Sequence, residues 1–543
     1  MNDLVVKGKI STLNLLRLLL RFSIGTHAVT GDLSQFYYSC KLKEEQWNLQ
    51  RFLFREGLDP NGPLLEGVIG ALIYGVKCVS AQTEHAVEEI ANSVENGHPN
   101  LAHFLRCCRY VDDLAESCEK AEPLSLVTKE ADDTFNKIGL VCKGWTRSGS
   151  DPLEEIAKVG GTISIAGQRW TPKVDCIEIP IPDLHFGVRR RGRVDEKVPR
   201  FEGCKDDMEE FVPKKLTRRK IASKVASLYD LLGKFAPIYG GLKADLSKVV
   251  KLTTGWDDVV SMDIREKWIE NFWKVEQLKG IRFARARMPV DAIDRNMRMI
   301  TLVDAAMGMI MVGIWVGFKR TNGSWSCQHL IGRPLLAKED STIPKNELQG
   351  LTVGSNLQWI VRKALQDWVS SYILAGDSRV ALCWVSAENK PLAIFQRNRA
   401  IQIRSNLDLE NLYHVRSESN PSDVGTRPEK VTLGDVGPGS RWENGDPWMR
   451  KEIEQAVNDN ILKPVSDLRI NDEEESEFRK GLIFEKVPEI LTRGHVINET
   501  RVSNIEKRVN FSKYVLLPTK FSFAAVVRIL SHVMNFISSC KLT

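Results

Sequence analysis

The stretch CCRYVDDLAES, residues 107–117, places two adjacent aspartates, Asp112 and Asp113, inside an apolar run. Neighbouring carboxylates repel one another, and each is costly to remove from water. A polar turn between the strands RCCRY and LAESC would explain the pair without a ligand. The alternative is a hairpin tip that binds a divalent cation. The letters YVDD alone do not decide between the two, because short matches arise by chance in long chains.

Composition narrows the class of protein. The chain has 543 residues, of which 43% are hydrophobic and 27% charged, which predicts a globular protein of several domains. Its net charge of +6 is compatible with a polyanionic partner. The eleven cysteines have no regular spacing, which favours reduced thiols over a disulfide framework, and no Cys/His set has the spacing of a zinc site.

The predicted location is intracellular, either cytoplasmic or nuclear, without membrane attachment. The N-terminus MNDLVVKGKIST lacks a signal-peptide pattern. The apolar stretch 521–539 is interrupted by Arg528 and His532, so we interpret it as a buried or amphipathic helix, with a membrane span as the alternative.

Periodicity along the chain predicts a mixed α/β and α+β multidomain fold. Helices are expected at 13–24, 78–96 and 127–138, with strands at 27–32, around the Asp-Asp hairpin and around 158–181. The segment 186–224 reads as loop-rich. Its basic run RRRGR at 189–193 is typical of a solvated face but also suits phosphate contacts. Helix is then expected from 219 to about 280. Beyond it the expected elements are strands at 297–306, 308–319 and 324–335, a helix from Pro344, a strand at 371–377, and an acidic, solvated run at 471–477.

Three acids form a first candidate site. Asp32 lies at the end of the strand HAVTGD, and Asp112 and Asp113 follow after a helical crossover. If the two strands are neighbours, these carboxylates converge and need a cation. Mg²⁺, which prefers oxygen ligands, is the natural partner, and two such ions support phosphoryl transfer.

The segments AVTGDLSQFYYSCKL, LIYGVKCVSAQTEHAVEEIA and RYVDDLAES resemble successive palm motifs of reverse transcriptases. LTRRKIASKVASLYDLLGKFAPI, GWDD (255–258) and GPGSRWENGDPWM (437–449) are similar to segments of BEL/Pao-type LTR retrotransposon polyproteins. The resemblance covers nearly the whole chain. It implies a reverse transcriptase palm, a helical connection and a ribonuclease H-like domain.

The resemblance also implies roles for further residues. Tyr37 would stack under the incoming sugar and exclude a 2′-OH. Gly75 and Ser80 would contact template and nucleotide, although Ala81 stands where many relatives have proline. Tyr110 belongs to the YVDD motif, and Lys143 would protonate the leaving pyrophosphate. From the residues alone, Tyr37 is as readily a core aromatic and Lys143 a solvated lysine. KVGGTISI (158–165) would be a primer-gripping hairpin.

Four later acids form a second candidate site. Asp304 and Asp377 end predicted strands, Glu347 lies in the first helical turn after Pro344, and Asp423 lies in NPSDVGTRP. Each alone would be read as a surface acid. Their order resembles the metal-binding set of the ribonuclease H fold, with Gly313 as the small residue of its second strand. His414 would assist product release, although a structural histidine is the simpler interpretation.

The predicted domains are a palm with truncated fingers (1–184), a thumb- or connection-like region (185–290), a ribonuclease H-like domain (291–430) and a C-terminal connector (431–543). The predicted function is RNA-directed DNA polymerase and RNA–DNA hybrid ribonuclease. The cofactor is Mg²⁺ or Mn²⁺, and the partners are RNA template, DNA primer, hybrid duplex and deoxynucleotide triphosphates. Polymerase activity is expected to be weak or lost, because the family's fingers would lie before residue 1. A non-catalytic nucleic-acid-binding remnant is the alternative, and a cellular nuclease would leave YVDD unexplained.

Overall fold

The computed structural model describes residues 6–8, 13–56, 61–152, 154, 157–158, 160–187, 199–388 and 390–482. Among these residues, no helix combines the length and the apolar character needed to cross a membrane. The basic run at 189–193 and the apolar stretch at 521–539 lie outside the described residues.

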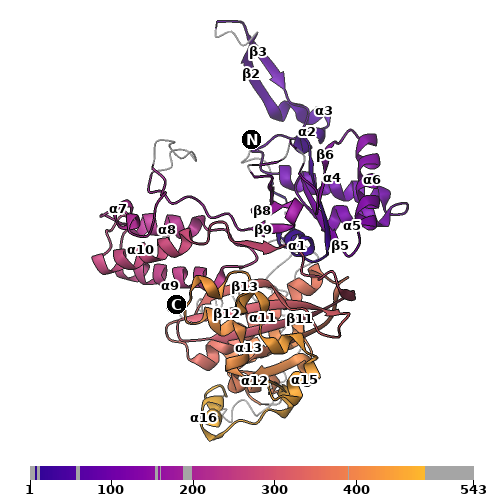
Figure 1. The fold of residues 1–543 in the computed structure, drawn as a ribbon. Coiled ribbons are helices and arrows are strands. Elements are labelled where there is room, and N and C mark those ends of the chain that lie inside the picture. Colours follow the sequence, from indigo (N-terminus) through magenta and orange to yellow (C-terminus); the bar gives the residue numbers. More distant parts are fainter. Residues whose placement is uncertain are drawn as a thin grey trace, which may run out of the picture. The chain divides into compact units, whose positions relative to one another are not determined.

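The first sheet carries the Asp-Asp hairpin (Figure 1). It is antiparallel, with the order β4-β5-β1-β6. Its strands are β1 (His27–Leu33), β4 (Arg109–Tyr110), β5 (Asp113–Cys118) and β6 (Cys142–Arg147). The helices of this region are α1 (Leu13–Phe22), α2 (Phe36–Ser39), α3 (Glu44–Trp47), α4 (Val79–Val94), α5 (Pro99–Cys107) and α6 (Ala121–Lys137). All the elements expected between residues 13 and 147 are present.

Apolar side chains explain the packing of these helices. The leucine-rich helix α1 buries Leu18, Leu19 and Leu20 completely. Helices α4, α5 and α6 enclose a separate core with Phe104 and Phe135 at its centre. The helices therefore bury most of β1 and β5, whereas the edge strand β6 stays largely accessible.

A small hairpin follows the first strand. It consists of β2 (Arg51–Arg55) and β3 (Leu64–Val68), and η1 (Asn48–Gln50) precedes it. Figure 1 shows the hairpin projecting from the helices α2 and α3. Its strands pair only with each other, and Phe52 and Leu53 are largely exposed.

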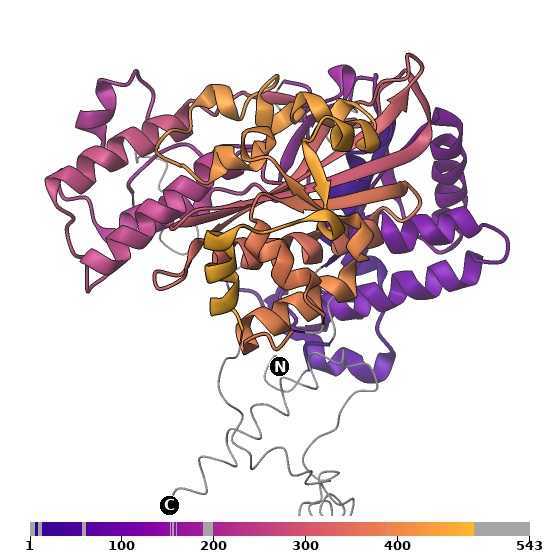
Figure 2. The same ribbon diagram turned by 90° about the horizontal axis from the view of Figure 1, so that it is seen from below.

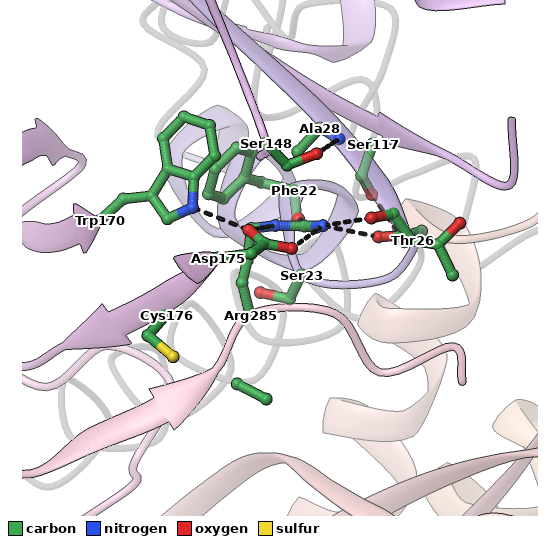
Figure 3. Close-up of polar contacts among 12 residues, drawn as sticks. Phe22, Ser23, Thr26, Ala28, Ser117, Ser148, Trp170, Asp175, Cys176 and Arg285 are labelled. Atoms are coloured by element: carbon green, nitrogen blue, oxygen red, sulfur yellow. Dashed lines mark hydrogen bonds and ion pairs between the residues drawn. The ribbon is translucent and has the colours of Figure 1, made fainter. Parts of the chain in front are cut away.

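A second sheet connects the palm-like region to the helices that follow. Its order is β10-β9-β8-β7, formed by β7 (Ile163–Ile165), β8 (Gln168–Thr171), β9 (Cys176–Glu178) and β10 (Arg282–Ala284), with η3 (Pro172–Val174) between β8 and β9. Directly after β10, the buried Arg285 binds both carboxylate oxygens of Asp175 at 2.6 and 2.8 Å. It also donates to the carbonyls of Phe22, Gly25 and Thr26 at the end of α1 (Figure 3).

The helical region expected from 219 to about 280 is present and consists of separate helices. It contains α7 (Asp207–Phe211), α8 (Arg218–Ser227), α9 (Ala236–Leu252) and α10 (Met262–Glu276). The chain leaves the helix at Leu228 because the Asp230 carboxylate accepts hydrogen bonds from the backbone N–H groups of Lys234 and Phe235. Gly233, with φ of 70°, completes the turn, and Pro237 opens the next helix.

The largest sheet has the order β13-β12-β11-β14-β15-β16. Strands β11 (Ala292–Ala305), β12 (Met309–Arg320) and β13 (Gln328–Leu336) are antiparallel, whereas β14 (Val369–Gly376) and β15 (Leu412–Val415) run parallel to β11. The antiparallel strand β16 (Leu462–Pro464) completes it, so the sheet includes a strand beyond residue 430.

Helices α11 (Ile343–Ala364), α12 (Arg379–Ser386) and α13 (Ile394–Asn406) cover one face of this sheet, as Figure 2 shows. Gly350 and Gly354 lie against the side chain of Val303, and a Cβ at Gly350 would come within 2.3 Å of it. The other face contacts α9 and the 3-10 turn η6 (Pro421–Gly425). The remaining elements are η4 (Leu409–Asn411), η5 (Ser417–Ser419), η7 (Leu433–Asp435), α14 (Arg441–Asn444), η8 (Pro447–Arg450), α15 (Ile453–Asn458), η9 (Val465–Asp467) and α16 (Asp472–Lys480).

The acidic run at 471–477, expected as a solvated segment, begins helix α16. Asn471 and Glu474 form a capping box, and the acids of the first turn lie at the positive end of the helix dipole. The fold as a whole is the mixed α/β and α+β multidomain arrangement that the sequence predicts. The predicted domain boundaries at 184, 290 and 430 stay predictions.

Candidate functional sites

The first acidic cluster lies where β1 and β5 run side by side. Their antiparallel register places Asp32 directly opposite Asp113, so the two side chains are on the same face of the sheet. Asp112 sits in the turn between β4 and β5, and its carbonyl accepts from the N–H of Leu33 at 3.0 Å. Asp32, Asp112 and Asp113 therefore converge at one end of adjacent strands, which is the geometry that the sequence predicts.

This cluster is electrostatically unfavourable without a cation. Burial, together with the charges of Asp112 and Asp32, raises the pKa of Asp113 to about 7. Burial also raises the pKa of Asp112. The Lys143 ammonium lies 2.8 Å from the Asp32 carboxylate and supplies part of the missing positive charge. A bound divalent cation would supply the remainder, so the donor set fits Mg²⁺ or Mn²⁺.

A buried arginine holds the hairpin tip in place. Val111 adopts φ of 59°, a conformation that is strained for a β-branched residue. Arg109 donates to the carbonyl of Val111 at 2.7 Å and forms an ion pair with Glu84 of α4 at 2.9 Å. Arg109 thus connects the turn that carries Asp112 to a helix behind the sheet.

Replacing Arg109 with methionine is expected to loosen this turn without unfolding the chain. Affinity of the first cluster for Mg²⁺ should fall by about tenfold, because the turn is no longer fixed. Isothermal titration in an Asp377→Asn background would isolate this cluster from the second one. Arg106→Met is the matched control, since the Arg106 side chain bonds to Glu88, Asn92 and Glu95 of the exposed α4 region. Equal affinity in both variants would contradict the positioning role.

The other residues expected at this site have distinct surroundings. Tyr37 is buried, with its ring 4.6 Å from that of Tyr74. Burial raises the pKa of Tyr37, a hydrogen bond with Ser80 opposes the rise, and the charge of Asp112 adds to it. Gly75 has φ of 90°, which favours glycine, and Tyr110 is partly exposed opposite Asp113 in the hairpin. Their roles toward nucleotide and template stay predictions.

The second acidic cluster lies at the end of the large sheet. Asp304 comes from β11, Glu347 from the first turns of α11, and Asp377 directly follows β14. One carboxylate oxygen from each lies within 4.8 Å of the other two. The parallel pairing of Val303 with Gly376 brings the ends of the two strands together. Asp304, Glu347 and Asp377, which the sequence predicts as one site, therefore come from separate elements and lie close together in the fold.

Burial is deeper here than in the first cluster. It raises the pKa of Asp304 to about 7, with a further contribution from the charge of Asp377. Burial also raises the pKa of Glu347 well above its usual range. Glu347 accepts from the N–H of Ala305 at 2.7 Å, but its other oxygen is buried and has no hydrogen-bond partner among the described residues. A cation bound by these carboxylates would satisfy that oxygen.

Asp423 approaches this cluster from η6. Its charge raises the pKa of Asp304, and its carboxylate forms an ion pair with Arg427 at 3.0 Å. Buried hydrogen bonds fix the turn that carries it: Asn420 donates to the Val303 carbonyl at 2.8 Å, and Ser422 to the Leu302 carbonyl at 3.0 Å. All four predicted acids therefore lie in one region.

His414 is half-buried in β15, opposite Gly376. Burial and the charge of Arg379 lower its pKa, while a hydrogen bond with the backbone of Asp377 opposes that change. A neutral His414 bonded to this backbone fits the structural role. Gly313 lies in β12 opposite Leu302 of β11.

Sequence reasoning missed several residues that hold the second cluster. The Thr426 hydroxyl donates to the Asp304 carboxylate, and the Ser417 hydroxyl donates to Asp377 at 2.6 Å. Thr426 and Arg427 lie three and four residues after Asp423 in NPSDVGTRP, so their proximity to that acid was a usable signal. Ser417 had no such signal, because its contact depends on the pairing of β14 with β15.

The raised pKa of Asp304 has a consequence for stability that can be measured. The pKa of Asp304 in the folded chain lies above its unfolded-state value near 4. The contribution of Asp304 to the free energy of unfolding is therefore fully present below pH 4 and is lost as the pH rises through about 7. Asp304→Asn should therefore raise the free energy of unfolding of the metal-free chain by roughly 2–4 kcal/mol above pH 7. The gain should shrink as the pH falls toward 4. Chemical denaturation at several pH values tests this, and a gain that is independent of pH would contradict it.

The order of strands and the placement of the acids define a ribonuclease H-like domain. Residues 217–378 match the family model described as the Pao retrotransposon-like RNaseH-like domain. The matched range contains Asp304, Glu347 and Asp377, and it begins at the N-cap of α8. The resemblance to Pao-type retrotransposons that the sequence indicates is thus confirmed for this part of the chain.

Two solved structures are similar to larger parts of the chain. The first is a foamy viral protease-reverse transcriptase in complex with RNA/DNA hybrid, 14% identical over 79% of this chain, with a TM-score of 0.43. The second is a foamy viral protease-reverse transcriptase dRH in complex with double-stranded DNA, 13% identical over 77% of this chain, with a TM-score of 0.45. The chain spans 48% of the length of the first and 61% of the second. No curated protein matches the sequence.

Proposed function

We propose that this chain cleaves the RNA strand of RNA–DNA hybrids at the cluster of Asp304, Glu347, Asp377 and Asp423. The observation that carries the proposal is the convergence of three buried or half-buried carboxylates from β11, α11 and the end of β14. Such a set is costly unless it binds cations, and it lies within a domain of ribonuclease H-like type.

Each residue of the second cluster would have a distinct role in metal binding. Mg²⁺ or Mn²⁺ bound there would activate a water molecule and stabilise the departing 3′-oxygen. Asp304 and Glu347 would bind from the buried side, and the hydroxyl of Thr426 would keep Asp304 oriented. Asp377, fixed by Ser417, would complete the set from the solvent side. Asp423 would bind more loosely, because Arg427 competes for it.

The first cluster supports a second proposed activity, RNA-directed DNA synthesis from a DNA primer. Asp32, Asp112 and Asp113 would bind the metal ions, Tyr37 would select the deoxynucleotide triphosphate, and Lys143 would protonate the pyrophosphate. The paired register of Asp32 and Asp113 supports this role. Because Lys143 already contacts Asp32, it would have to move toward the leaving group as metal binds.

Cleavage of a labelled RNA–DNA hybrid in Mg²⁺, and its loss on chelation, tests the proposed function. We expect binding to the hybrid to weaken steeply as salt rises, because phosphate contacts release counterions. Cleavage of the hybrid without extension of a primer would support the proposed ribonuclease activity alone. Salt-dependent binding with neither reaction would instead support a non-catalytic remnant.

A further inference from the structure

A third cluster of metal-ligating side chains lies away from both acidic sites. His103 comes from α5, Cys108 from the residue that ends this helix, and Glu116 from β5. One ligand atom from each lies within 4.8 Å of the others. Cys108 and Glu116 are buried, and the Cys108 thiol contacts the Glu116 carboxylate directly. This cluster therefore combines imidazole, thiol and carboxylate.

A fourth donor comes from the ribonuclease H-like region. The Asp367 carboxylate, in the turn after α11, lies 3.8 Å from His103 Nε2. A cavity of about 570 Å³ opens here, and His103, Glu116 and Asp367 are among the residues that line it. An ion can thus reach the cluster from solvent.

Arg21 forms ion pairs with the two carboxylates, but it does not satisfy every donor atom of the cluster. Its guanidinium lies 2.9 Å from Glu116 and 3.4 Å from Asp367. Glu116 and Asp367 therefore share the guanidinium of Arg21. His103 Nε2 is buried and has no hydrogen-bond partner among the described residues.

We propose that His103, Cys108 and Glu116 bind one Zn²⁺ ion, with Asp367 as the fourth ligand. Binding breaks the S–H bond of Cys108 and forms a Zn–S bond, and the proton leaves to bulk solvent. The thiolate, the two carboxylates and Arg21 then balance the charge of Zn²⁺. The ion would link the palm-like region to the ribonuclease H-like region.

The donor types select zinc over the magnesium of the acidic clusters. Mg²⁺ requires oxygen ligands, whereas Zn²⁺ accepts sulfur, nitrogen and oxygen in a tetrahedral site. Metal–ligand distances of about 2.0–2.3 Å place tetrahedral donors roughly 3.5 Å apart. Asp367, which lies outside the 4.8 Å group, must therefore move toward the other donors as Arg21 shifts, and the Cys108 thiol must move away from Glu116. The site escaped sequence analysis because its ligands do not follow a short Cys/His spacing and one comes from another region.

Titration of the metal-free full chain with Co²⁺, followed by absorbance, tests the proposal. We expect one equivalent to give a thiolate charge-transfer band and the intense visible bands of tetrahedral Co²⁺. Added Zn²⁺ should remove both. Co²⁺ bound by the acidic clusters would lack the thiolate band, so failure of the proposed nuclease site would not affect this readout. Zn²⁺ should also raise the Tm of the parent chain.

Variants decide whether these residues are the ligands. His103→Gln, at a partly exposed position, should weaken Zn²⁺ binding by on the order of a hundredfold and abolish the Zn²⁺-dependent rise in Tm. Cys108→Ser should remove the charge-transfer band. Cys107→Ser, the neighbouring cysteine outside the cluster, should keep both signals. Absence of the band in the parent, its persistence in Cys108→Ser, or unchanged Zn²⁺ affinity in His103→Gln would overturn the assignment of these residues as ligands.

Discussion

Asp377→Asn is expected to abolish cleavage of the RNA strand in a hybrid. The substitution keeps the shape of the side chain and its acceptor for Ser417, but it removes the negative charge that a metal ion needs at the end of β14. Changes to groups that merely support metal ligands typically cost 10–100-fold, so loss of a ligand charge should cost on the order of a hundredfold or more. Single-turnover cleavage of a labelled hybrid measures the effect.

The matched control is Asp112→Asn, which removes the same charge from the other cluster. Asp112 lies in the β4–β5 turn, on a different sheet from Asp377, so hybrid cleavage should be nearly unchanged. Primer extension should respond in the opposite way, with loss in Asp112→Asn and retention in Asp377→Asn. Cleavage lost in Asp112→Asn but kept in Asp377→Asn would show that the two sites are assigned wrongly.

The candidate acids could be predicted because each ends a recognisable element. Asp32, Asp304 and Asp377 follow apolar, β-rich runs, and strands that pair in register bring their ends together. The acids therefore converge once the pairing is known. Glu347 needed only its place in the first turns of a helix that begins near a proline.

The groups that orient these acids could not be predicted in the same way. Arg109 touches Glu84, and Thr426 touches Asp304, through contacts between residues far apart in the sequence. The hydrophobic periodicity of the sequence does not indicate such a contact, because helix and strand patterns reflect only which face of an element is buried. Lys234 is an example. It lies in a predicted helical region, yet its side chain is fully buried and its ammonium lies 2.7 Å from the Glu443 carboxylate.

The break between α8 and α9 also depends on a side chain. The sequence predicts a helical region from 219 to about 280 and places no boundary within it. The Asp230 side chain instead competes for backbone N–H groups, and Gly233 supplies the positive φ that reverses the chain. Tertiary contacts confirm the turn, since Gly233 packs against the backbone of Gly332 in β13.

The largest effect on stability is expected from Arg285. Its side chain is fully buried, binds both oxygens of Asp175, and satisfies the carbonyls of Phe22, Gly25 and Thr26 (Figure 3). Arg285→Met would leave the Asp175 carboxylate and these carbonyls without their donor. Breaking a buried ion pair in this way costs about 3–5 kcal/mol, which should lower Tm by roughly 10 °C.

A double-mutant cycle with Asp175→Asn separates the ion pair from the other contacts of Arg285. Asparagine tolerates the left-handed conformation of Asp175, where φ is 50°, and can still accept from the Trp170 indole N–H, which lies 2.8 Å from the carboxylate. Once Arg285 is methionine, Asp175→Asn should be stabilising, because it removes the charge of a partly buried carboxylate that has lost its cationic partner. Arg282→Met, at the exposed first residue of β10, is the control and should change the free energy of unfolding little. Equal costs for Arg282→Met and Arg285→Met, measured by chemical denaturation, would mean that the pair does not hold the end of α1 to the second sheet. The corner after α1 leads directly into β1, so this ion pair also fixes where the strand bearing Asp32 begins.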